Sequence, residues 1–109
     1  MGDKVLLAIS TFPDRETAQR ISHELVRGKL AACANILPTI DSIYRWQGKV
    51  EQGSETVVLF KLSEDRQSAF QDKLRSLHPY AVPEIIFVAV ADGLLEYLQW
   101  VGESCAEPR

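Results

Sequence analysis

The chain has 109 residues, of which 46% are hydrophobic and 25% are charged. This length fits a single domain over residues 1–109, with one core and little room for an internal ligand chamber. The formal net charge of −3 and the lack of a basic stripe argue against nucleic-acid binding. No apolar run reaches the ~18 residues of a membrane span, so no membrane partner is expected.

The N-terminus and the cysteines bear on the compartment of the protein. Residues 1–4 lead into a short apolar run without a cleavage-site pattern, so we expect a cytoplasmic protein. Cys33 and Cys105 form no C-x-x-C pair. We interpret Cys33 as a buried free thiol, and we expect Cys105, in a polar tail, to be exposed.

The first half of the chain predicts a strand, a helix and a long extended segment. Residues 5–11 form an apolar run of strand length. Asp14 can cap a following helix, which Gly28 stops. Residues 31–44 read as extended, and Pro38 requires an edge position or a bulge there. At about 3.3 Å per residue this segment outreaches a compact domain, so it should project as part of a hairpin.

The second half predicts a hairpin tip, a returning strand, a helix, a connector, a last strand and a last helix. The tip is expected at residues 45–49, the returning strand at 56–62 and the first helix at 64–77. The connector follows at 78–84, the last strand at 85–91 and the last helix at 93–102. Ser63 can cap the first of these helices. The last helix should turn Leu94, Leu95, Leu98 and Val101 inward.

The order β-α-β-β-α-β plus a C-terminal helix predicts an α+β protein with the ferredoxin-like split βαβ fold. Its antiparallel sheet runs in strand order 4-1-3-2, which leaves residues 31–44 on an edge. An open apolar edge invites pairing with another chain, so we expect a ring of like subunits. The alternative is a curled, bulged strand covered by the C-terminal helix.

No motif for nucleophilic, phosphate-binding or dinucleotide chemistry is present, so the sequence predicts neither an enzyme nor an organic cofactor. His78 is the best single candidate for a metal ligand, because imidazole binds copper, zinc, iron and nickel. It stands at a predicted helix end beside Pro79. The alternative is that His78 ends the helix and hydrogen-bonds one of its last carbonyls.

Aromatic and charged residues from separate segments predict a ligand cleft between subunits. Trp46, at the hairpin tip, would be exposed in a monomer and is an expected anchor of an interface or pocket. The residues predicted to line the cleft are Tyr44, Trp46, Lys61, Tyr80, Glu84 and Trp100, with Glu55 adding charge nearby. The alternative is plain packing between subunits beside a solvated charged face.

Four segments, at residues 30–38, 42–49, 78–85 and 97–100, together resemble the CutA family of divalent-cation tolerance proteins. The resemblance implies a ferredoxin-like subunit and a homotrimer built through long strands. In architecture it is similar to the trimeric PII signalling proteins, which bind small effectors between subunits. It also implies a cytoplasmic role in tolerance to copper and other divalent cations, with Cu(II) binding proposed for some members.

Two positions depart from the family members that have proposed copper ligands. Those members have Cys at the position of Ser10, and a His-His pair where this chain has Leu77 and His78. Two functions follow as hypotheses. One is a non-catalytic homotrimer that binds Cu(II) or another divalent cation weakly through His78. The other is a PII-like signalling or adaptor trimer that binds a small ligand in the cleft.

Overall fold

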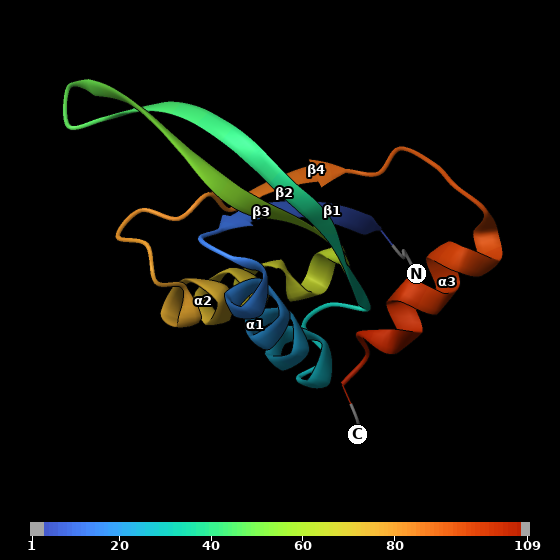
Figure 1. Ribbon diagram of the computed structural model, residues 1–109. Helices are drawn as coiled ribbons and strands as arrows, with labels where there is room; N and C mark the ends of the chain where they lie inside the picture. Colours follow the sequence, from blue (N-terminus) through green and yellow to red (C-terminus); the bar gives the residue numbers. More distant parts are fainter. Residues whose placement is uncertain (1–3, 108–109) are drawn as a thin grey trace.

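One antiparallel sheet carries the fold, and the computed structural model describes residues 4–107 of the chain (Figure 1). The strands are β1 (Val5–Phe12), β2 (Cys33–Trp46), β3 (Lys49–Ser63) and β4 (Ile86–Ala89). Their order in the sheet is β2-β3-β1-β4, which confirms the predicted order and the α+β fold class. Within residues 4–107 no helix is long and apolar enough to cross a bilayer. The expectation drawn from residues 1–4, which lack a cleavage-site pattern, concerns residues that lie largely outside the described range 4–107.

The helices are α1 (Arg15–Arg27), α2 (Gln67–Leu77) and α3 (Leu95–Ser104), with a 3-10 turn, η1 (Glu64–Arg66), before α2. α1 and α2 lie side by side on one face of the sheet (Figure 1). Asp14 caps α1 as predicted, because its side chain accepts a hydrogen bond of 2.8 Å from the backbone N–H of Thr17. Ser63 does not cap a helix; its hydroxyl donates to Asp65 instead.

The hydrophobic core lies between the sheet and the two helices α1 and α2. Alternate residues of the central strands point into it, because successive strand side chains face opposite sides of a sheet. Its largest fully buried apolar side chains are Phe12, Ile21, Leu25, Val58, Phe60, Leu62, Phe70, Leu74 and Val101. Phe70 anchors this core, since its ring makes edge contacts with both Phe60 and Phe87. On the other face of the sheet, Ile86 and Val88 of β4 are exposed.

The hairpin of β2 and β3 projects beyond the rest of the subunit (Figure 1). The molecule therefore measures 46 × 26 × 23 Å along its principal axes. Pairing shifts register between Ile36 and Thr39, which confirms the edge or bulge expected at Pro38. The returning strand begins at Lys49, so the predicted strand, which started at residue 56, was too short. Residues 49–55 are mostly polar, and only their pairing with β2 makes them a strand.

The C-terminal helix differs from its prediction in two ways. Leu94 and Leu95 are 71% and 65% exposed, so they do not point inward within one subunit. Cys105 was expected to be exposed, and it is 1% exposed. The apolar stripe that meets the core consists of Leu98, Val101 and Cys105, which lie one and two turns apart. Leu94 and Leu95 lie before this stripe at the start of the helix.

Candidate functional site

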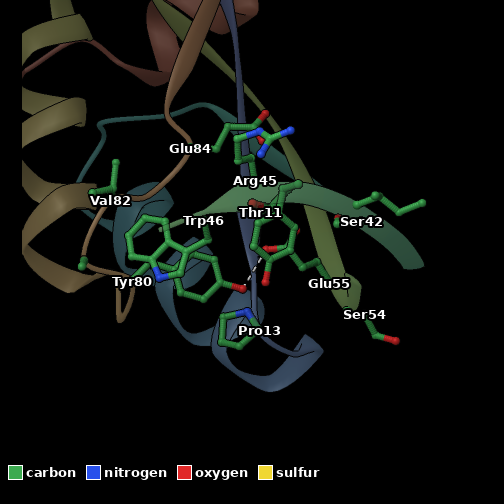
Figure 2. Close-up of a pocket in the computed structure, with 14 residues that line it drawn as sticks. Thr11, Pro13, Ser42, Arg45, Trp46, Ser54, Glu55, Tyr80, Val82 and Glu84 are labelled. Carbon is green, nitrogen blue, oxygen red and sulfur yellow. Dashed lines mark hydrogen bonds between the residues drawn. The ribbon is translucent and has the colours of Figure 1, made fainter. Parts of the chain in front are cut away.

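A cavity of about 730 Å³ opens beside the hairpin (Figure 2). Its walls come from the end of β1, the outer part of β2, the facing part of β3 and the loop after α2. Four of the six residues predicted to line a cleft do line this cavity, namely Tyr44, Trp46, Tyr80 and Glu84. Strand pairing and the loop after α2 therefore bring Tyr80 to the same cavity as Tyr44 and Trp46, which lie 34 or more residues before it in the chain.

Glu55 links the two main walls of the cavity. The Tyr80 hydroxyl donates a hydrogen bond of 2.8 Å to the Glu55 carboxylate (Figure 2). Burial and this carboxylate raise the pKa of Tyr80 well above its usual range, so the hydroxyl remains a donor. The sequence suggested Glu55 only as a nearby charge. The position of Glu55 depends on its pairing with Ile40 in the sheet. The sequence did not predict this pairing, because it placed the start of the returning strand at residue 56 and the strand begins at Lys49.

The cavity is electronegative. Two carboxylates, Glu55 and Glu84, line it against one guanidinium, that of Arg45. Burial raises the pKa of Glu84, and the negative charge of Glu55 raises it further. The carboxylates of Glu55 and Asp14 also act to raise the pKa of Tyr80. A positively charged group entering the cavity would be favoured by this field.

His78 ties the loop after α2 to the end of β1. It is only 8% exposed, and its ring stacks on Phe12 with the centroids 4.7 Å apart. The ring Nε2 lies 2.7 Å from the Thr11 carbonyl oxygen. The Tyr80 backbone N–H donates to Nδ1 at 3.2 Å. Since Nδ1 accepts, Nε2 must carry the proton and donate to Thr11.

His78 also ends α2, as the sequence suggested, but its side chain reaches a different acceptor. The expected alternative to metal binding was a hydrogen bond from the ring to one of the last carbonyls of the helix. Instead, the backbone N–H of His78 donates to the Leu74 carbonyl, and the ring reaches β1. The acceptor is 67 residues away in the chain, a distance over which local sequence patterns carry no information.

The surroundings of His78 do not fit a preformed metal centre. Both ring nitrogens are engaged in hydrogen bonds, so neither has a free lone pair for a metal. Leu77 offers no ligand atom. Ser10 is fully buried, and its hydroxyl has no hydrogen-bond partner. Within residues 4–107 no three His, Cys, Asp or Glu side chains are grouped closely enough to hold a metal ion.

The two other predicted cleft residues, Lys61 and Trp100, do not line the cavity. The Lys61 ammonium donates to the side chain of Asn35. Cys33, which pairs with Lys61 across the strands, is half-buried, with its sulfur 3.8 Å from the Tyr97 hydroxyl. The Tyr97 ring in turn lies 5.5 Å from that of Trp100. Within one subunit the predicted cleft is therefore split into a cavity and a separate group beside α3.

The split βαβ subunit with a long projecting hairpin places the protein among the small α+β proteins of ferredoxin-like fold. The sequence profile described as CutA1 divalent ion tolerance protein matches residues 6–104. The chain therefore belongs to the CutA1 family.

Two relatives, one bacterial and one human, are similar to this chain over most of its length. It is 41% identical over 98 residues to the divalent-cation tolerance protein CutA of Thermus thermophilus, covering 90% of this chain and 95% of that one. It is 42% identical over 97 residues to human protein CutA, covering 89% of this chain and 54% of the human protein.

Solved CutA structures confirm the fold. The structure of CutA from Xylella fastidiosa matches with a TM-score of 0.91 at 44% identity, covering 94% of this chain and 98% of that one. CutA1 from Oryza sativa matches with a TM-score of 0.92 at 34% identity, covering 96% of each chain. The long hairpin and the added C-terminal helix are thus features of a family fold.

Proposed function

We propose that this protein acts in divalent-cation tolerance as a non-catalytic homotrimer. The relatives named divalent-cation tolerance proteins support the general role. The observation that carries the proposal is the amount of apolar surface that one subunit leaves uncovered. Large exposed patches of this kind mark interaction sites in soluble proteins.

In this proposal neighbouring subunits cover the exposed apolar residues. Ile43 and Val50 on the hairpin are 71% and 65% exposed. Ile86 and Val88 are exposed on the face of the sheet opposite α1 and α2, and Leu94 begins the short C-terminal helix. A closed ring covers such surfaces on every subunit by the same contacts. The proposal that this ring has three subunits rests on the family resemblance.

In this proposal a divalent cation, Cu(II) or another, binds only weakly. A metal ion that used His78 would have to displace the hydrogen bond at the ring nitrogen it binds, from Tyr80 at Nδ1 or to Thr11 at Nε2. Breaking buried hydrogen bonds opposes the gain from metal coordination. No organic cofactor takes part. We place the protein in the cytoplasm, while a structural relative from Archaeoglobus fulgidus is named a periplasmic protein.

Calorimetric titration with Cu(II), Zn(II) and Mn(II) tests the proposal, with light scattering on the same sample. We expect a mass three times the subunit's 12.2 kDa. We also expect weak binding that is reduced in His78→Gln, with His23→Gln as the matched control. A monomer, or tight copper binding that is unchanged in His78→Gln, would contradict the proposal.

The cavity favours a second candidate function, a PII-like signalling or adaptor trimer that binds a small ligand. Tyr44, Trp46, Tyr80 and Glu84 already line one cavity within a subunit. Lys61 and Trp100 would then join them only from a neighbouring subunit. Trp fluorescence with a panel of metabolites distinguishes this function from metal binding, since a ligand response should be absent in Trp46→Ala.

A further inference from the structure

We propose that the cavity beside the hairpin binds a small organic cation of the quaternary ammonium type. This inference rests on the second candidate function and names the chemical class of its ligand. It stands on the volume of the cavity, on the charges of its walls and on the aromatic rings that line it.

The carboxylates supply the charge that an organic cation needs. Glu55 and Glu84 both line the cavity, and they are close enough for the charge of Glu55 to disfavour ionisation of Glu84. A bound cation would relieve this repulsion by attracting both carboxylates. Arg45 is the one cationic side chain among the lining residues, and within residues 4–107 it forms no ion pair with either carboxylate.

The aromatic rings favour an organic cation over a hydrated metal ion. Tyr44, Trp46 and Tyr80 line the same cavity. Figure 2 labels two of these rings, those of Trp46 and Tyr80. The negative face of an aromatic ring attracts a cation, most strongly for Trp, and quaternary ammonium groups are recognised in this way. A metal ion would need several converging oxygen or nitrogen ligands, and it would gain little from these rings.

The cavity wall is held in place before a ligand arrives. The Tyr80 hydroxyl is fixed by Glu55, and its backbone N–H is fixed by His78. His78 is itself fixed by Thr11 and by stacking on Phe12. A wall that is already ordered loses little conformational freedom on binding, which favours a small ligand. In this arrangement His78 is a positioning residue for Tyr80.

Choline and its uncharged carbon isostere 3,3-dimethyl-1-butanol test the proposal at constant ionic strength. Trp46 reports binding by fluorescence in a Trp100→Phe background, because the chain has two tryptophans. Choline should give a saturable change, and the isostere should bind at least about fivefold more weakly. Glu84→Gln should weaken choline binding at least about threefold. Glu24→Gln, which removes an equal charge on α1, should leave it unchanged.

Equal binding of choline and its isostere would overturn the proposal, as would wild-type affinity in Glu84→Gln. No saturable change in a sample that light scattering identifies as a trimer would also overturn it. The metabolite panel on the same sample tests the second candidate function separately, because a response to another ligand without a response to choline would overturn only the ligand class proposed here.

Discussion

At the scale of single residues, His78 has the largest number of distinct roles. It ends α2, stacks on Phe12, donates to Thr11 and accepts from Tyr80. The bond accepted from Tyr80 depends on a neutral ring with its proton on Nε2, because a protonated ring would turn Nδ1 into a donor facing the Tyr80 N–H. The stability of the loop that carries Tyr80 should therefore depend on pH.

Burial lowers the pKa of His78 below its ordinary value of 6.5, although the Thr11 carbonyl and the Glu55 charge act in the opposite direction. As the pH falls, the unfolded chain takes up this proton before the folded one does. The contribution of His78 to the free energy of unfolding is therefore complete above about pH 6.5. It falls with pH below that, by at most about 1.4 kcal/mol per pH unit.

Urea denaturation from pH 7.5 down to pH 5 at fixed protein concentration measures this dependence. His78→Gln should have a flatter pH dependence than the wild type, since it removes the titrating group. His23→Gln, which changes an exposed histidine on α1, should keep the wild-type slope. If the unfolding free energy of His78→Gln depended on pH as steeply as that of the wild type, a group other than His78 would be responsible for the pH dependence.

At the scale of elements, the hairpin of β2 and β3 decides the shape of the subunit. Its turn places Gln47 and Gly48 at φ values of 50° and 80°. Two successive residues with positive φ match the right-handed twist of the strands, and glycine tolerates such a conformation best. The turn sets the register that pairs Ile40 with Glu55, and so it positions one wall of the cavity.

Gly48→Ala should lower the free energy of unfolding by about 1 kcal/mol, because an L side chain is strained at φ +80°. Gly53→Ala is the matched control on the same hairpin. Gly53 has no positive φ, and an added Cβ there meets no atom within 4 Å. Gly53→Ala should therefore leave the free energy of unfolding unchanged or raise it slightly, as measured by urea denaturation. An equal loss of unfolding free energy in the two variants would contradict the inference that the turn favours glycine at position 48.

At the scale of the whole molecule, the single chain leaves apolar side chains exposed on several elements. The extended hairpin, the open face of β4 and the start of α3 all expose apolar side chains. If these surfaces are covered by like subunits, the folded state is stabilised by mass action. The apparent melting temperature should then rise with protein concentration, which thermal denaturation over a hundredfold concentration range measures.

Ile43→Lys tests the same surface by substitution. Ile43 is largely exposed in one subunit, so lysine there disturbs no core of its own. Ile36 is a poorer choice, because it packs against the core. Ile43→Lys should shift the light-scattering mass toward the monomer with secondary structure retained by circular dichroism. Val26→Lys on α1 should leave the mass unchanged. A stable trimer of Ile43→Lys would place the interface elsewhere.

The sequence by itself determined the order of the elements and the projecting hairpin, and that order implied the strand order of a split βαβ fold. These follow from local information, namely apolar periodicity, the Asp14 cap and the position of Pro38. It also identified four of the aromatic and acidic residues that line one cavity.

The tertiary structure alone decided which distant groups meet. Tyr80 finds Glu55 and His78 finds Thr11 across 25 and 67 residues, through strand register and loop packing that no local pattern encodes. Cys105 is buried and Leu94 exposed for a related reason, because the docking of α3 determines which of its sides meets the core. Burial is a property of what an element packs against, and periodicity describes only the element itself.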